Sequence, residues 1–252
     1  MDITTRWVDA PGDGKSMPVY VAEPSEASKF PALVYFHIGL GLNEQHQAMV
    51  RRLASMGFVV AAPELFYRLG PHLIFEPTPD REARDLAMAS LSDWGLIGDA
   101  RTALNLLKEN PRVDGMRIGT IGFCIGGRIS ILAASVHSDI RATVAAYATE
   151  LRHTGHPLAR PIDVSELVGG LNGPLLHLSG EHDSLCTPDI VKYLATVMRD
   201  HNKPFEYEIY SDCGHAFFDE DIPQRPGYFG FHEASCTAGW ERSVQFLTAH
   251  LK

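Results

Sequence analysis

Short apolar runs alternate along the chain with amphipathic runs whose apolar positions recur every three or four residues. The short runs have the length and the flanking glycine, proline and polar residues that are typical of strands. They lie at 17–22, 30–37, 58–65, 117–122, 141–147, 174–180 and 205–210. The amphipathic runs are typical of helices that cover a buried surface. Strands that alternate with helices predict a mostly parallel sheet with helices on both faces.

Helix boundaries and loops can be predicted from particular residues. Asn43 is suited to cap a helix that Gly57 would end, and Thr187 precedes a proline that can open another helix. The stretch 148–173 has no clear periodicity and is rich in His, Pro and Gly, which predicts a long loop or partial lid over one end of the sheet. Because no repeat or linker divides residues 1–252, we expect one α/β domain.

Composition narrows the class of protein. The apolar share of 45% can fill one large core, and 31 acidic against 22 basic residues give a net charge of −9. This acidic balance argues against nucleic acid and anionic membranes as partners. The first residues lack the charged and apolar regions of a signal peptide, and the four cysteines lack zinc-type spacing. We therefore expect a cytoplasmic protein with free thiols and no bound metal.

Three chemically active side chains follow three of the predicted strands. Cys124 comes after the strand at 117–122, Asp183 after the strand at 174–180 and His215 after the strand at 205–210. Open parallel sheets bind their ligands beyond the carboxyl ends of the strands. The order of thiol, carboxylate and imidazole therefore predicts a Cys–His–Asp triad at that edge.

The surroundings of Cys124 match a nucleophile elbow, the tight strand–turn–helix that presents a catalytic side chain. Gly122 and Gly126 lie two residues before and after Cys124, where small residues let the strand and helix backbones approach. The N-terminus of the following helix would stabilise a thiolate, and the N–H of Ile125 could bind an oxyanion. Alternatively, Cys124 is a small residue packed at a tight turn. Asp183 alone could equally cap a turn.

At these residues the chain resembles the dienelactone hydrolase family of the α/β-hydrolase fold. The shared motifs are G-x-C-x-G-G at 122–127, G-x-x-D at 180–183 and G-H-[AS]-F at 214–217, within a resemblance that spans about 17–250. The resemblance implies an eight-stranded sheet and a Cys–His–Asp hydrolase. We expect it to cleave a carboxylic ester or lactone through a thioester acyl-enzyme.

One departure from the family affects the nucleophile. The family usually has a glutamate close to the nucleophile in an H-E-x-x-G-L-N pattern, and here Ile38 takes that place. Because Ile38 cannot pair with a thiol, we expect His215 alone to activate Cys124, which should rest as a partial thiolate.

A second departure concerns the charge of the substrate. Family members that act on dienelactone, an anion, use arginines, one of them four residues after the histidine, and here that position is Asp219. Arg81 or Arg84 could retain the other arginine, and Arg225 or Arg152 could restore a cation. A partly lost set of arginines, with the acid Asp219 inserted, should weaken the binding of an anionic lactone. We therefore expect an ester or lactone hydrolase that resembles the carboxymethylenebutenolidase type, rather than an enzyme dedicated to dienelactone. A general small-ester carboxylesterase that does not act on dienelactone is the alternative.

The expected site and its rivals follow from these residues. The N–H groups of Ile125 and of the turn at Ile38–Gly39 would form the oxyanion hole. The residues expected to line the substrate pocket are Ile38, Tyr67, Arg81, Phe123 and Phe217. We expect no cofactor, a small-molecule ester or lactone as substrate, and a monomer or homodimer.

Two rival functions remain open. One is a redox-reactive thiol at Cys124 with Cys213 as its resolving partner. The other is a small-molecule binding module with weak or no turnover.

Overall fold

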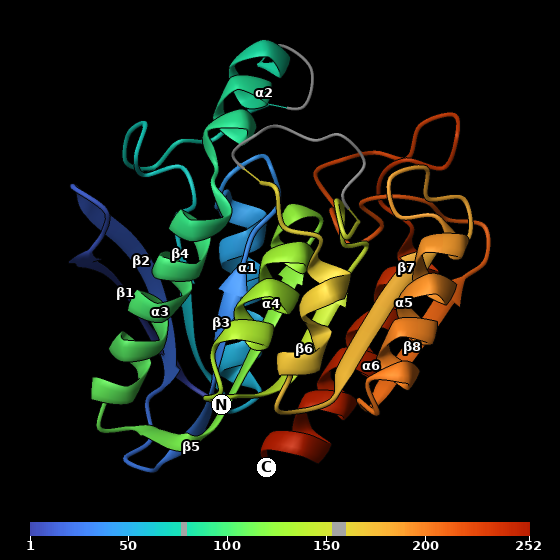
Figure 1. Ribbon diagram of the computed structural model, residues 1–252. Helices are drawn as coiled ribbons and strands as arrows, with labels where there is room; N and C mark the ends of the chain where they lie inside the picture. The colour runs from blue at the N-terminus through green and yellow to red at the C-terminus, as the bar shows by residue number, and fades with distance from the viewer. Residues whose placement is uncertain (77–79, 153–159) are drawn as a thin grey trace.

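The computed structural model describes residues 1–76, 80–152 and 160–252, and within them eight strands form one sheet (Figure 1). The strand order is β1-β2-β4-β3-β5-β6-β7-β8. The strands are β1 (Ile3–Pro11), β2 (Ser16–Pro24), β3 (Phe30–Phe36), β4 (Val59–Pro63), β5 (Val113–Phe123), β6 (Ile140–Ala146), β7 (Leu175–Gly180) and β8 (Phe205–Tyr210). The first two pairings, β1 with β2 and β2 with β4, are antiparallel, and the others are parallel.

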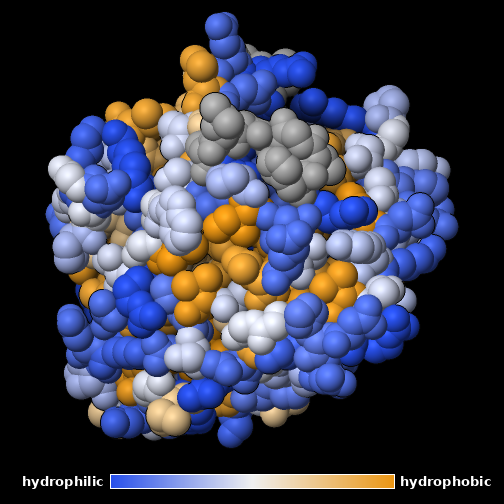
Figure 2. Space-filling view, viewed as in Figure 1, coloured by the Kyte–Doolittle hydropathy of each residue, from blue (hydrophilic) through white to orange (hydrophobic). Residues whose placement is uncertain are grey.

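Helices cover both faces of the sheet (Figure 1). The helices are α1 (Glu44–Ser55), α2 (Arg81–Ser90), α3 (Asp93–Glu109), α4 (Ile125–Val136), α5 (Pro188–Asp200) and α6 (Glu233–Leu251), with a 3₁₀ turn η1 (Val164–Gly170). Apolar residues of α3, α4 and α5 pack in one core cluster, and those of α1 and α6 pack in another. On the face seen in Figure 2, apolar side chains gather over α4 and polar ones surround them. None of the described helices is long and apolar enough to cross a membrane.

The sheet confirms the predicted α/β architecture, with one strand that the hydrophobic pattern did not indicate. Strand β1 lies at the edge of the sheet, and most of its side chains are exposed. An edge strand without a buried face carries little apolar periodicity, so the pattern does not reveal it. The predicted lid at 148–173 includes residues 153–159, which lie outside the described residues. Its described part contains η1.

The turn between β5 and α4 has the backbone geometry of a nucleophile elbow. Cys124 has φ 55° and ψ −121°, a strained conformation for a residue with a side chain. A Cβ on Gly122 would lie 2.1 Å from the carbonyl oxygen of Gly126. A Cβ on Gly126 would lie 2.2 Å from the carbonyl oxygen of Phe36. Only glycine at both positions allows helix α4 to start directly against the ends of β5 and β3.

A buried arginine holds α4 against its neighbours. Arg128 is one turn after Cys124, and its guanidinium pairs with the buried carboxylate of Asp93 at 2.6 Å. It also donates to the carbonyl oxygens of Glu150 and Ile162 at 3.0 Å each. These bonds satisfy N–H donors of the Arg128 guanidinium, whose charge would otherwise be costly to bury. Helix α4 is thereby fixed to α3 and to the chain on either side of residues 153–159.

Replacement of Gly126 by alanine tests the close approach at the elbow. Because the added Cβ would meet backbone oxygens that cannot swing away, Gly126→Ala should lower the free energy of unfolding by about 1–3 kcal/mol. Gly98 is a matched control, since it lies in α3 with no atom within 4 Å of the added Cβ. Gly98→Ala should be neutral or stabilise by about 0.5–1 kcal/mol in urea unfolding. Equal effects of the two substitutions would contradict the account.

Candidate active site

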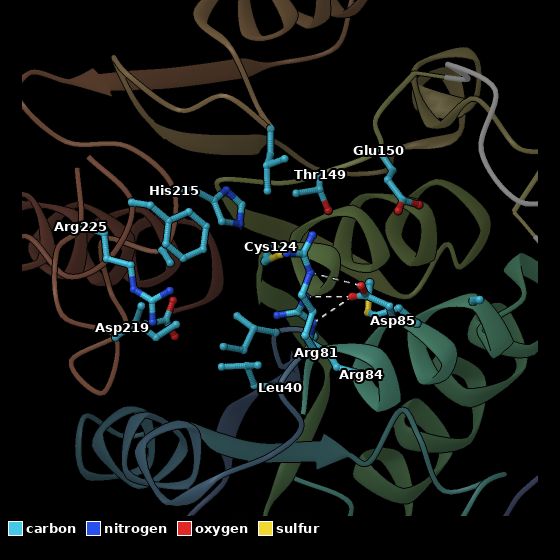
Figure 3. A pocket seen from close by; sticks show the side chains of 18 of the residues that line it. Leu40, Arg81, Arg84, Asp85, Cys124, Thr149, Glu150, His215, Asp219 and Arg225 are labelled. Atoms are coloured by element: carbon cyan, nitrogen blue, oxygen red, sulfur yellow. Dashed lines mark hydrogen bonds and ion pairs between the residues drawn. The ribbon is translucent and has the colours of Figure 1, made fainter. Parts of the chain in front are cut away.

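The three predicted triad residues meet at the carboxyl edge of the parallel strands. Cys124 follows β5, Asp183 follows β7 and His215 follows β8, and these strands lie near one another in the sheet. Cys124 and His215 both line a cavity of about 720 Å³, and Figure 3 shows their side chains beside each other. The structure therefore brings together the residues that the strand-end pattern selected.

Asp183 is positioned by the backbone and in turn positions His215. One carboxylate oxygen of Asp183 accepts the N–H groups of Leu185 and Cys186 at 2.8 and 2.9 Å. The other oxygen lies 2.9 Å from Nδ1 of His215. Both side chains are buried. Since Nδ1 faces a carboxylate, it carries a proton and leaves Nε2 as the nitrogen available for chemistry.

The electrostatics of His215 favour its protonated form. Nε2 is buried and has no nitrogen or oxygen partner among the described residues. Burial would lower the pKa of His215. A negative charge on the facing Cys124 and the carboxylate of Asp183 outweigh it and raise the pKa to about 10 from the ordinary value of 6.5. The site therefore favours the imidazolium form of His215.

Two aromatic rings hold the imidazole in place. The ring of Tyr147 meets it edge-on, with centroids 5.0 Å apart, and the ring of Phe229 stacks on it at 5.6 Å. Tyr147 follows β6 in a left-handed conformation, with φ 38°. Phe229 lies on the loop after His215 and also lines the cavity. The ring is therefore fixed by packing as well as by its bond to Asp183.

Of the two predicted oxyanion-hole residues, Gly39 lines the cavity, and Ile125 directly follows the cavity-lining Cys124 without lining the cavity itself. Ile125 is the first residue of α4, where backbone N–H groups have no acceptor within the helix. Ile38 and Gly39 follow β3 and both line the cavity. The amide of Cys124 itself donates to the carbonyl of Ala146 at 3.0 Å, so it is not an oxyanion donor.

The cavity walls carry arginines from separate segments of the chain. Arg81 and Arg84 of α2 both line it and pair with Asp85, at 3.8 and 2.8 Å (Figure 3). Arg160 is buried and pairs with Glu150 at 2.8 Å. Arg225 is exposed and lies across the cavity from Asp85. Arg81, which was expected to line the substrate pocket, lies in this wall.

Asp219 lines the cavity but does not present a free carboxylate to it. Its oxygens lie 3.0 Å from Nε2 of His46 and 2.8 Å from the hydroxyl of Tyr147, which donates to it. Nδ1 of His46 lies 2.5 Å from the hydroxyl of Tyr35. All four side chains are buried. This network was not evident from the sequence, and it engages both oxygens of the acid that Asp219 was expected to insert into the substrate pocket.

Three predicted pocket residues belong to the core instead. Tyr67 accepts the N–H of Asp13 at 2.8 Å and donates to the carboxylate of Asp99 at 3.0 Å, and it does not line the cavity. Phe123 and Phe217 are fully buried and pack in the cluster that includes α1 and α6. Their positions next to Cys124 and His215 in the chain do not direct them into the cavity, since neighbouring side chains point to different sides.

The structure adds lining residues that the sequence did not indicate. These are mainly apolar or small side chains of α2 and of the loops after β6, β7 and β8, among them Met88, Ala89, Thr149, Leu185, Ile222, Pro226 and Phe229. The loop after β8 is shaped by Pro226 and Gly227, which has φ 86°, a proline–glycine turn signal that could have marked it.

The environment of Cys213 disfavours the alternative that Cys124 is a redox-reactive thiol. Cys213 is fully buried and donates to the carbonyl oxygen of Tyr210 at 3.6 Å. Burial raises the pKa of the Cys213 thiol, which makes it a poor resolving thiolate. Within the described ranges, no group of three or more His, Cys, Asp or Glu residues is placed to hold a metal ion.

Comparisons with known proteins indicate one family of hydrolases. The dienelactone hydrolase family matches residues 17–251. A Salmonella typhimurium protein named "Putative carboxymethylenebutenolidase" is 30% identical over 246 residues, which cover 95% of this chain and 85% of that protein. A Bradyrhizobium protein named "Probable 2-oxo-3-(5-oxofuran-2-ylidene)propanoate lactonase" is 27% identical over 99% of this chain and 96% of its own length.

A solved structure extends the likeness to three dimensions. It is titled as a "Putative Dienelactone Hydrolase" from Klebsiella pneumoniae and is 26% identical to this chain. The two superpose with a TM-score of 0.85 over 99% of this chain and 100% of that one. The family match covers the three strand-end residues and nearly the whole sheet. The chain belongs to the dienelactone hydrolase family and is a hydrolase.

Proposed function

We propose that this protein hydrolyses a small carboxylic ester or lactone, as a carboxymethylenebutenolidase-type enzyme, through a thioester formed on Cys124. The observation that carries the proposal is the placement of His215. Its Nδ1 is held by Asp183 at 2.9 Å, and its unpartnered Nε2 is beside the thiol at the tip of the elbow. A nucleophile, a base and a group that orients the base are the parts that acyl transfer requires.

In the first half of the reaction, the Cys124 thiolate attacks the carbonyl carbon of the bound ester or lactone. The N–H groups of Ile125 and Gly39 stabilise the negative charge that develops on the carbonyl oxygen. The tetrahedral intermediate then expels the alkoxide, which takes the proton from Nε2 of His215. The products of this half are a thioester on Cys124, an alcohol and a neutral imidazole. For a lactone, the alcohol stays attached to the acyl group.

In the second half, the neutral imidazole acts as a general base. His215 takes a proton from water while the water oxygen attacks the thioester carbon. Collapse of this intermediate expels the Cys124 thiolate and releases the carboxylic acid. Asp183 stabilises the imidazolium formed in this step and keeps the ring in the correct tautomer. The thiolate and imidazolium are then restored for the next cycle.

The cavity supports a substrate that combines an apolar body with a negative group. Ile38, Leu40 and Met88 supply apolar surface near the reacting groups. The carboxylate oxygens of Asp219 are engaged inside the protein by contacts with His46 and Tyr147. On the wall opposite α2, Arg225 provides a cation. Because a guanidinium binds carboxylates, this cation favours a carboxylate-bearing lactone over the alternative of neutral esters alone.

Replacement of Cys124 tests the nucleophile. Stopped-flow reaction of the wild type with p-nitrophenyl acetate should give a burst of about one p-nitrophenol per chain, followed by slower turnover. Cys124→Ala should lose the burst, and its turnover should fall by about a thousandfold or more. Cys236→Ala, which removes a buried thiol from α6, should behave as the wild type. A burst that survives in Cys124→Ala would exclude Cys124 as the acylated residue.

The protonation of His215 gives a prediction in pH. The pKa of His215 in the folded protein, about 10, exceeds the ordinary 6.5. Protonated His215 therefore stabilises the fold fully below about pH 6.5, and this contribution is lost as the pH rises through 10.

The acylation rate should also fall as the pH rises towards 10, because the imidazolium that protonates the alkoxide is lost. NMR titration of the His215 ring should show the high pKa, and Cys124→Ala should lower it by removing the facing charge. The signal is identified by its absence in His215→Gln. A wild-type pKa near 6.5 would refute the ion pair.

A matched pair of lactones tests the role of Arg225. Arg225→Ala should raise KM by about two- to fivefold for a lactone that carries a carboxylate, the effect expected of an exposed ion pair. KM for the corresponding carboxamide should not change. Arg152→Ala is the control, because Arg152 lies over the ring of Tyr193 and does not line the cavity. Equal KM changes for both lactones would instead support the general small-ester carboxylesterase.

A further inference from the structure

His37 lies directly after β3 and is fully buried between two backbone groups. Its Nδ1 is 2.6 Å from the carbonyl oxygen of Ile38, and its Nε2 is 3.1 Å from the backbone nitrogen of Leu65. Leu65 follows β4, the strand beside β3 in the sheet. The imidazole therefore connects the ends of two neighbouring strands immediately behind residues that line the cavity.

The two contacts define the proton position on this imidazole. A backbone N–H can only donate, so Nε2 must accept the bond from Leu65 and cannot carry a proton. Nδ1 must then carry the proton and donate it to the carbonyl of Ile38. Burial, with a smaller contribution from His46, lowers the pKa of His37 to about 3 and outweighs its backbone bond to Ile38. The ring is therefore neutral, in one tautomer, at every pH at which the enzyme would work.

This hydrogen bond also determines the direction of a neighbouring N–H group. The carbonyl of Ile38 and the N–H of Gly39 belong to one planar peptide unit, and in a trans peptide they point in opposite directions. The carbonyl is turned towards His37 and accepts a second bond, from Gly41 N–H at 3.2 Å. The N–H of Gly39 is consequently turned away from His37, and Gly39 lines the cavity.

The same strand end packs against the start of α4. A Cβ on Gly126 would lie 2.2 Å from the carbonyl oxygen of Phe36 and 2.6 Å from that of His37. The backbone that carries Gly39 is therefore held close to the helix turn that begins with Ile125. Both candidate oxyanion donors belong to these two touching segments.

We propose that His37 is a positioning residue for the oxyanion hole: its Nδ1–H holds the Ile38–Gly39 peptide so that the N–H of Gly39 faces the reacting carbonyl oxygen. This inference rests on the proposed acyl transfer at Cys124. His37 does not line the cavity, and it acts through the peptide that it orients.

Two amide substitutions separate the two hydrogen bonds of His37. In His37→Asn, the side-chain amide can take the place of Nδ1 and donate to Ile38, but the acceptor for Leu65 is lost. In His37→Gln, the longer amide can take the place of Nε2 and accept from Leu65, but the donor to Ile38 is lost. His37→Asn leaves the N–H of Leu65 without its acceptor, whereas His37→Gln leaves the carbonyl of Ile38 with its bond from Gly41 N–H. His37→Asn should therefore lose at least as much stability as His37→Gln.

Only the variant without the donor to Ile38 should lose catalysis. The acylation rate constant with p-nitrophenyl acetate should fall by about 10- to 100-fold in His37→Gln, with KM nearly unchanged, because an oxyanion donor acts mainly in the transition state. In His37→Asn it should stay within about threefold of the wild type. Alkylation of Cys124 by iodoacetamide needs no oxyanion hole and should proceed at the wild-type rate in both variants. Equal acylation rates in the two variants would overturn the inference.

A measurement on the wild type keeps the inference testable if a variant does not fold. Long-range ¹⁵N NMR of the His37 ring should show protonated Nδ1 and unprotonated Nε2, unchanged from about pH 5 to pH 9. A ring protonated at Nε2, or one that titrates in this range, would overturn it. Failure of the proposed function is distinct, because it would appear as a burst that persists in Cys124→Ala. Loss of that burst together with normal acylation in His37→Gln would reject the role of His37 alone.

Discussion

The candidate site depends on the close backbone contact between the start of α4 and the end of β3. At Gly126 there is no room for even one carbon atom, since a Cβ would lie 2.2 Å from the oxygen of Phe36. This contact holds the turn that carries Cys124 and Ile125 close to the strand end that leads to Gly39, and Cys124 and Gly39 both line the cavity. The strained backbone of Cys124 is compatible with a folded protein because the surrounding sheet and helix hold it from both sides.

Hydrogen bonds and ion pairs around the cavity determine which polar groups remain available for chemistry. The carboxylate of Asp219 contacts His46 and Tyr147, and Arg160 forms an ion pair with Glu150. In the described part of the chain, Nε2 of His215 is a buried polar atom that lacks a partner and belongs to a cavity-lining residue. A buried polar atom without a hydrogen-bond partner costs free energy of folding unless it interacts with a substrate or a facing charge. This observation supports the proposal that His215 is the group that exchanges protons.

The sequence predicted the parts of the site that depend on local constraints. Cys124, Asp183 and His215 were found because each follows a strand within a glycine-containing turn, and the parallel sheet then brings strand ends together. Ile38, Gly39 and Arg81 also line the cavity. Tyr67 and Phe123 were misplaced, because position next to a strand end does not determine which way a side chain points.

Long-range features could not be predicted in the same way. The network of Asp219 joins residues from β3, α1, the end of β6 and the loop after β8, and no local pattern connects them. The tautomer of His37 likewise depends on Leu65, which belongs to a different strand end. The edge strand β1 was missed because its exposed side chains carry no apolar alternation.

The central claim is that Cys124 carries the acyl group during turnover. It is tested most directly by acid-quenching the enzyme during hydrolysis of a slow ester and locating the bound acyl group by peptide mass spectrometry. The account predicts the acyl group on the peptide that contains Cys124, and its disappearance as the substrate is exhausted. An acyl group on any other residue, or none during active turnover, would contradict it.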